Sequence, residues 1–303
     1  MLKLWSIAGY RNFGDALSPV LIQEMIDAPV VSTDSAKSEM VAVGSLFAFG
    51  HCLYREQAPI ASKDWLKIIR LRLIDAIAPV VHVWGTGFLY EKIPACPIVI
   101  RTLNLHAVRG KYTLDILKRT GLFSGKTSIA YGDPGLFYSA LLPEIPKKEY
   151  DLGVVPHEVD RYAGEFVVEV LSAHGMKVKY IDVYDNPLKV VSEIAACDCI
   201  LSSSLHGLIV ADSLGIPNRQ MMLSYFGYTK DQYLFKYRDY YSAYDMELPD
   251  PLTPQDVFAV GTGIVNNIRK GFIVDRDKVN SCREGLMSSF PFRISRPTRW
   301  SAK

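Results

Sequence analysis

The sequence predicts an α/β protein with two Rossmann-like domains, each built on a parallel β-sheet, that face a cleft. In both halves of the chain, apolar strand-like runs alternate with helical runs, a pattern typical of parallel sheets. Several strand-like runs end in glycine beside Asp, Ser or Thr, which is typical of loops that line a site at the carboxyl edge of a sheet. A charged segment with prolines, residues 143–150, separates the two halves.

The composition indicates a folded protein with reduced thiols. Hydrophobic residues make up 49% and charged residues 22% of the 303 residues, so the chain can build substantial cores. A net charge of +2 is too small to indicate nucleic acid as a partner. The cysteines form no CxxC pair and no apolar run has the length of a membrane span, so we expect a cytoplasmic protein. No cluster of His, Cys and carboxylate residues has metal-ligand spacing, and we expect neither a metal nor a cofactor.

The first half is expected to form an N-terminal domain over residues 1–145. A strand at 2–8 leads through the glycine-containing loop 9–15 into a helix at 17–26. Asp15 either caps that helix, as Asp commonly does, or lends its carboxylate to a site. Further strands are expected at 41–45, 79–84, 97–101 and 128–131, and a further helix at 112–120.

The alternation of strands and helices restarts after residue 150, which predicts a C-terminal domain over residues 146–250. An apolar helix after Leu205 is expected to end at Gly215, because glycine commonly terminates helices. A tail, residues 251–303, is expected to pack its helices back on the N-terminal domain. The remaining strands are expected at 151–155, 178–181 and 199–201, and the remaining helices at 164–174, 187–196, 255–269 and 277–289.

The segment Ser203-Ser-Leu-His-Gly207 lies where a predicted strand ends and a predicted helix begins. Ligands bind at this position in open α/β sheets, and the positive end of a helix favours an anion. A histidine held near an anion can donate a proton close to neutral pH. We therefore expect His206 to act in chemistry. The alternative is that Ser203 and Ser204 only cap the helix.

Residues 66–83 form an amphipathic pattern with positive charges on the polar face. A solvent-exposed helix face is the simpler interpretation. Weak peripheral contact with a membrane surface is the alternative.

Seven motifs in this order resemble the polysaccharide pyruvyl transferase family over about residues 7–245. They are Asn12-Phe-Gly-Asp15, Val43-Gly-Ser-Leu46, Trp84-Gly-Thr-Gly87, Val108-Arg-Gly110, Tyr131-Gly-Asp-Pro134, Ser203-Ser-Leu-His-Gly207 and Lys236-Tyr-Arg-Asp-Tyr240. The resemblance implies a fold similar to the GT-B glycosyltransferases. It also implies transfer of a pyruvyl group from phosphoenolpyruvate, as co-substrate, to a sugar of a surface polysaccharide or of its lipid-linked precursor, forming a pyruvate ketal.

The resemblance also implies roles for particular residues. His206 is the expected general acid, and Asp15 is expected to activate the attacking hydroxyl. We expect the donor to contact Arg109, Ser203, Ser204, Leu205, Gly207 and Lys236. We expect the acceptor to contact Asn12, Gly14, Gly85, Gly87, His157 and Tyr240.

One position departs from the family pattern. Many relatives carry arginine immediately before the Leu-His pair, where this chain has Ser204. Lys236 or Arg238 is the expected substitute. Both belong to the run 236–240, which we expect to be a loop whose tyrosines can stack on a sugar or simply lie on the surface.

Two other functions stay open from the sequence. A glycosyltransferase with a nucleotide-sugar donor would use a similar scaffold, because one fold hosts several reactions. A binding protein without catalytic activity would be consistent with Ser204 in place of arginine.

Overall fold

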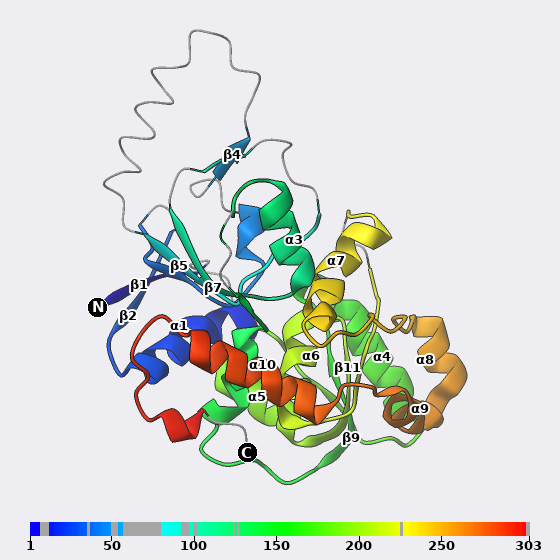
Figure 1. Ribbon diagram of the computed structural model, residues 1–303. Coiled ribbons are helices and arrows are strands. Elements are labelled where there is room, and N and C mark those ends of the chain that lie inside the picture. Colours follow the sequence, from blue (N-terminus) through cyan, green and yellow to red (C-terminus); the bar gives the residue numbers. More distant parts are fainter. Residues whose placement is uncertain are drawn as a thin grey trace.

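The computed structural model has two parallel β-sheets, each covered by helices (Figure 1). It describes residues 1–6, 12–34, 37–49, 54–56, 80–91, 97–99, 102–123, 125, 128–224 and 227–300. The α/β fold with a parallel sheet in each half, predicted from the sequence, is confirmed.

The first sheet has six parallel strands, drawn in blue through green in Figure 1. Their order across the sheet is β2 (Val30–Thr33), β1 (Leu2–Trp5), β3 (Met40–Val41), β5 (Val81–Trp84), β7 (Leu103–Val108) and β8 (Ala130–Tyr131). Strand β7 was not expected as a strand of its own, since His106 and Asn104 interrupt its apolar pattern. Residues 97–99, expected in this sheet, instead form β6 (Pro97–Val99), which pairs antiparallel with β4 (Tyr54–Glu56).

The second sheet has four parallel strands. Their order is β10 (Val178–Tyr180), β9 (Tyr150–Val155), β11 (Cys197–Ser202) and β12 (Asn218–Gln220). Helices α4 (Arg161–Ala173), α5 (Pro187–Ala195) and α6 (Leu205–Leu214) connect these strands. Gly215 ends α6 in the left-handed region at φ 67°, as expected for a glycine at that position.

One apolar core joins the two halves. It includes Leu4 and Trp84 of the first sheet, Ile200 of the second, and buried residues of α1 (Phe13–Ile26) and α6. The 3₁₀-helix η2 (Pro134–Leu141) packs against both of these helices. A second core fills the other face of the first sheet beneath α3 (Lys111–Arg119), and a third fills the α4 side of the second sheet.

The tail helices divide between the two sheets. Helices α8 (Pro254–Val260) and α9 (Ile264–Gly271) pack on the second sheet and α4. Helix α10 (Arg276–Ser289) crosses to β7, β8 and η2 of the first half (Figure 1). The indole N–H of Trp84 donates to the carbonyl of Leu286 at 2.9 Å and ties α10 to the first sheet. The domain boundaries themselves, 1–145, 146–250 and 251–303, stay a prediction.

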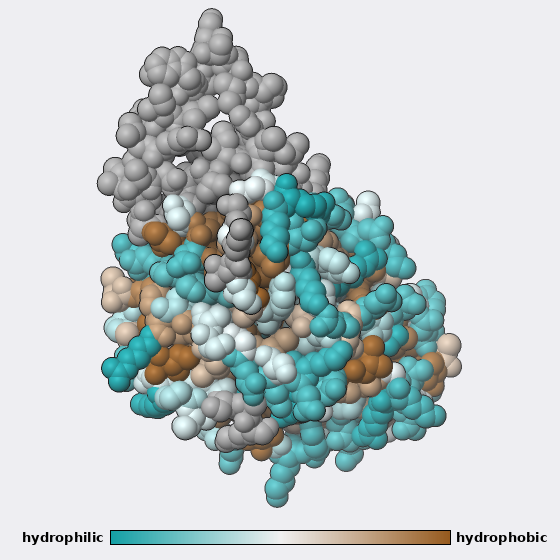
Figure 2. Space-filling model, viewed as in Figure 1, coloured by the Kyte–Doolittle hydropathy of each residue, from teal (hydrophilic) through white to brown (hydrophobic). Residues whose placement is uncertain are grey.

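The surface view shows mostly hydrophilic residues, with apolar residues in small separate patches (Figure 2). Within the described ranges, no helix combines the length and the apolar character that crossing a membrane requires. The expected amphipathic helix at 66–83 lies almost entirely outside the described residues, so the membrane contact proposed for it stays a prediction.

Candidate active site

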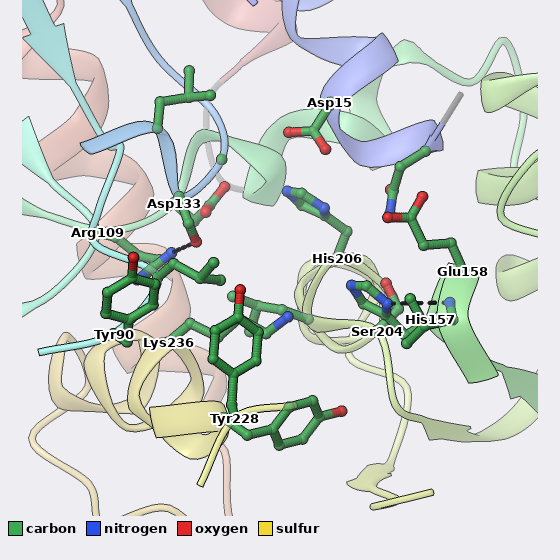
Figure 3. A pocket seen from close by; sticks show the side chains of 18 of the residues that line it. Asp15, Tyr90, Arg109, Asp133, His157, Glu158, Ser204, His206, Tyr228 and Lys236 are labelled. Carbon is green, nitrogen blue, oxygen red and sulfur yellow. Dashed lines mark hydrogen bonds between the residues drawn. The ribbon is translucent and has the colours of Figure 1, made fainter. Parts of the chain in front are cut away.

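A pocket of about 370 Å³ opens where the carboxyl ends of both sheets meet (Figure 3). Its size is within the range of small-molecule sites, about 300–1,000 Å³. The first half contributes Asn12, Asp15, Gly44, Ser45, Leu46, Leu89, Tyr90, Arg109 and Asp133. The second half contributes His157, Glu158, Val159, Ser204, Leu205, His206, Tyr228, Gln232, Tyr233 and Lys236.

The turn from β11 to α6 places His206 in the pocket. Ser204 is the N-cap residue of α6, but its side chain makes no capping bond, and its own N–H donates to Ser202 Oγ at 3.0 Å. His206 packs edge-on against Phe13 of α1, with ring centroids 6.2 Å apart. Burial, then the charges of Lys236 and Arg109, lower the pKa of His206 to about 3. Its imidazole is therefore neutral at pH 7 in the free protein.

Asp15 faces the same pocket from the first turn of α1 (Figure 3). The helix begins at Phe13 and its N-cap is Asn12, whose side chain accepts the Gly14 N–H at 3.1 Å. The interpretation of Asp15 as the cap is therefore wrong. Burial, then the negative charges of Asp133 and Glu158, raise the pKa of Asp15 to about 7. Near neutral pH this carboxyl can both hold and release a proton.

Lys236 lies on a helix, not on the expected loop. Thr229 and Gln232 form a reciprocal capping box that starts α7 (Lys230–Ser242). The ammonium of Lys236 lies over the rings of Tyr233 and Tyr237, and the residue lines the pocket. Burial, then the charge of Arg109, lower its pKa to about 8. It is still mainly cationic at neutral pH.

Arg238 does not line the pocket. It is two residues after Lys236 on α7, and it pairs with exposed Asp231 at 3.1 Å. Of the two expected substitutes for the missing arginine, only Lys236 therefore lines the pocket.

Arg109 borders the pocket but is held by the protein itself. Its Nε donates to Asp239 at 2.9 Å, its Nη1 to Ser45 Oγ at 2.7 Å and its Nη2 to the carbonyl of Phe88. Both members of the Arg109–Asp239 ion pair are 0% exposed. The arginine therefore contributes a fixed positive charge near the pocket and links α7 to loops of the first half.

Ser203 and His157 belong to one hydrogen-bond network. Ser203 Oγ donates to Asp160 at 2.7 Å and accepts the N–H of His157 at 2.9 Å. Ser203 thus positions the turn after β9, but it does not line the pocket, so the expected direct donor contact is corrected. His157 does line it, and burial, followed by the charge of Lys236, lowers its pKa to about 3.

Four glycines expected to contact the donor or the acceptor, Gly14, Gly85, Gly87 and Gly207, do not line the pocket, and those contacts stay predictions. A Cβ on Gly207 would lie 2.4 Å from Ser202 Oγ, and one on Gly87 would lie 2.7 Å from the Arg109 guanidinium. Gly85 has φ +89° and its Cβ would meet the ring of Pro134 at 2.2 Å. Gly14 adjoins His206. These glycines permit close packing around the site.

The structure also contradicts the expected contact of Tyr240 with the acceptor. Its hydroxyl donates to Asp212 at 2.8 Å in the core, and its side chain is 0% exposed. On α7, helical spacing places Tyr240 on the face toward the core. A loop, as expected for residues 236–240, would not define the direction of its side chain.

Several lining residues were not expected. Asp133 caps η2 by accepting the Gly135 N–H, and it also borders the pocket, where burial raises its pKa to about 6. The strand-end position of its Gly-Asp-Pro motif was the available signal. Tyr90, Glu158, Tyr228 and Gln232 carried no comparable signal.

The arrangement combines two carboxyls with raised pKa values, Asp15 and Asp133, with the cations Lys236 and Arg109 and the imidazole of His206. In the described part of the chain, no group of three or more His, Cys, Asp or Glu residues has the geometry of a metal site.

A curated relative, an uncharacterized protein of Acanthamoeba polyphaga mimivirus, is 35% identical over 166 residues, which are 54% of this chain and 54% of the relative. The chain thus matches about half the length of that relative. Two structures of the wall teichoic acid polymerase TagF align with 95% of this chain and 84% of theirs, at 10% and 9% identity and TM-scores of 0.42 and 0.38. The sequence pattern of polysaccharide pyruvyl transferases matches residues 60–219, just over half of the 303 residues. The chain belongs to the polysaccharide pyruvyl transferase family.

Proposed function

We propose that this protein transfers a pyruvyl group from phosphoenolpyruvate to two hydroxyls of a sugar, forming a pyruvate ketal. The acceptor would belong to a surface polysaccharide or its lipid-linked precursor. The observation that carries the proposal is the meeting of His206, Asp15 and Lys236 in one pocket of a protein of this family.

The donor is a phosphate and a carboxylate on a three-carbon enol, so its site needs positive charge. Lys236 supplies a cation at the pocket wall, and Arg109 adds a fixed positive charge beside it. The N-terminus of α6, which starts at Leu205, adds backbone N–H groups and the positive end of its dipole. Ser204, at the cap of that helix, also borders the pocket.

The proton chemistry is assigned to His206 and Asp15. Burial is the main cause of the low pKa of His206, so bound phosphoenolpyruvate would have to stabilise the imidazolium directly with its negative charge, as well as offset the charges of Lys236 and Arg109. His206 then delivers its proton to the methylene carbon of the donor. One sugar hydroxyl attacks C2 and gives its proton to Asp15.

Ketal closure completes the reaction. The bond between C2 and the phosphate oxygen breaks, and inorganic phosphate leaves with one proton. A second sugar hydroxyl attacks C2 and releases its own proton. The two protons taken up, by the methylene carbon and by phosphate, balance the two that the hydroxyls lose.

The test measures phosphate release from phosphoenolpyruvate with a panel of free and lipid-linked sugars. Acceptor-dependent release is expected in the wild type, and a decrease of about 10²–10⁴-fold is expected in His206→Ala, as for a lost general acid. His174→Ala is the matched control, because His174 is exposed at the end of α4 and lies outside the pocket.

Two outcomes would count against the proposal. Unchanged release in His206→Ala would remove His206 as the acid. Release of nucleotide from nucleotide sugars, with no phosphate from phosphoenolpyruvate, would favour a glycosyltransferase instead.

A further inference from the structure

Two tyrosines from opposite halves of the chain meet at one wall of the pocket. Tyr90 comes from the loop after β5, and Tyr228 comes from the segment before α7. Their ring centroids are 5.7 Å apart and the ring planes are tilted by 36°. In Figure 3 they lie together on the side of the pocket away from Asp15.

The backbone beneath each tyrosine is anchored. Phe88, two residues before Tyr90, stacks on Phe47 with centroids 4.9 Å apart and accepts a hydrogen bond from Arg109 through its carbonyl. Tyr228 directly precedes Thr229, the N-cap of α7. The rings themselves are partly open, and Tyr228 is 36% exposed. Tyrosines whose backbone is anchored and whose rings are accessible are better suited to binding a ligand than to packing in a core.

The pocket is chemically divided. The ionisable groups Asp15, His206 and Lys236 are the ones that suit the reaction, whereas Tyr90 and Tyr228 offer aromatic surface, with Leu89 also in the lining. A sugar ring is divided in the same way, with an apolar face of C–H groups and a rim of hydroxyls. Polarised C–H groups are attracted to the negative face of an aromatic ring. A nucleobase is flat and would need two parallel rings to lie between. The rings of Tyr90 and Tyr228 are tilted by 36° and form a wedge instead.

We propose that Tyr90 and Tyr228 form an aromatic subsite that holds the sugar ring of the acceptor and directs its hydroxyls toward Asp15 and His206. The inference rests on the proposed function, because the subsite is proposed to bind the sugar acceptor of that reaction. It adds two specificity-determining residues that no motif of the sequence contains. Since one ring comes from each half, the subsite depends on both halves of the chain.

The experiment measures binding and kinetics side by side. Saccharide binding is measured by titration calorimetry with methyl glycosides, and nucleosides serve as competitors. The variants are Tyr90→Ala, Tyr228→Ala and Tyr228→Phe. The control is Tyr162→Ala, because Tyr162 is 88% exposed on α4 and lies outside the pocket.

Each alanine variant is expected to weaken saccharide binding and raise the acceptor KM by about 2–10-fold, the loss expected for one aromatic contact. The KM for phosphoenolpyruvate should not change. Tyr228→Phe should keep most of the binding, because the ring carries the contact.

The outcomes separate this inference from the proposed function. If phosphoenolpyruvate is not used but saccharide binding falls in the alanine variants and survives in Tyr228→Phe, the proposed function fails and the subsite stands. If phosphoenolpyruvate is used but the alanine variants keep the wild-type acceptor KM, the subsite fails and the function stands. Binding of nucleosides in place of saccharides, or of no saccharide by the wild type, overturns the subsite.

Discussion

The imidazole of His206 lies directly against the backbone of Gly14. A Cβ on Gly14 would be 2.0 Å from Nδ1 of His206, a separation that side chains cannot adopt. Gly14 sits in the first turn of α1 and its N–H is held by the cap residue Asn12, so the helix end is fixed. The absence of a side chain at residue 14 is therefore what allows α1 and α6 to bring Asp15 and His206 into one pocket.

Gly14→Ala should displace the His206 ring and lower kcat/KM for ketal formation by about 10²-fold, the cost of misplacing a catalytic group. The free energy of unfolding should fall by no more than about 1–3 kcal/mol, the usual cost of overpacking a buried contact, because alanine is favoured over glycine in helices by about 1 kcal/mol and so offsets part of it. Steady-state kinetics and urea unfolding measure the two effects. Gly285→Ala in α10 is the control, since its Cβ meets only Ala130, at 3.6 Å. Full activity in Gly14→Ala would contradict the assigned position of His206.

Lys236→Met should weaken binding of phosphoenolpyruvate by about 10-fold or more, because a charge-assisted contact to an anion is lost in a mostly buried place. Arg238→Met, two residues further along α7, should leave the affinity unchanged, because Arg238 pairs with Asp231 outside the pocket. Calorimetric titration with phosphoenolpyruvate measures both. Equal losses in the two variants would indicate a general charge effect rather than a donor contact.

Binding of phosphoenolpyruvate should be accompanied by proton uptake near pH 7. The anion should raise the pKa of His206 from about 3 and so favour its imidazolium form, the form that donates a proton in the proposed reaction. Titrations in buffers with different ionisation enthalpies measure the number of protons taken up. Proton release on binding would contradict this assignment, and the uptake should decrease in His206→Ala.

The stability of the protein should depend on the ionisation of Asp15. Its pKa is raised from 3.8 in the unfolded chain to about 7 in the folded one, so the folded state binds more protons between these values. The stabilisation is complete below about pH 4 and is lost as the pH rises to about 7. Asp15→Asn should therefore be more stable than the wild type at pH 8, by about 1–3 kcal/mol, and the difference should be much smaller at pH 4. Urea unfolding at both pH values measures it, and equal differences would exclude this ionisation as the cause.

The buried pair of Arg109 and Asp239 should matter more for stability than any surface pair. Asp239 also accepts hydrogen bonds from the N–H and hydroxyl of Thr113 at 2.8 and 2.7 Å. Asp239→Asn should cost about 3–5 kcal/mol, because it leaves the guanidinium buried without its counter-charge. Asp231→Asn on the same helix breaks an exposed pair and should cost less than about 1 kcal/mol. Denaturant midpoints compare them, and similar losses would mean that Arg109 finds another partner.

The sequence was sufficient to predict the parts of the fold that depend on local pattern. The end of β11, the start of α6 and its termination at Gly215 follow from apolar runs and from glycine chemistry. The positions of Asp15 and His206 followed from the loops expected after strands, and both residues line one pocket, whereas Lys236, expected on a loop, lines it from α7.

Long-range relationships could not be predicted in this way. The inward direction of Tyr240 required knowing that residues 236–240 are helical, and aromatic residues with charges between them read equally well as a loop. The contact of Tyr90 with Tyr228 joins loops 138 positions apart in the sequence, and nothing local to either residue indicates the other. The ion pair of Arg109 and Asp239 likewise joins residues that are far apart in the sequence.

The hydrogen bond from Trp84 to the carbonyl of Leu286 affects how the chain folds during its synthesis. Trp84 also packs against Phe290, with ring centroids 4.7 Å apart, and Phe137 packs against Trp300. During synthesis, Trp84 and Phe137 emerge from the ribosome long before Leu286, Phe290 and Trp300 do. Until α10 emerges, the nascent first sheet exposes a large aromatic surface to the cell, and contacts so distant in sequence form slowly. Newly synthesised chains should therefore depend on chaperones until the last helix closes over the sheet.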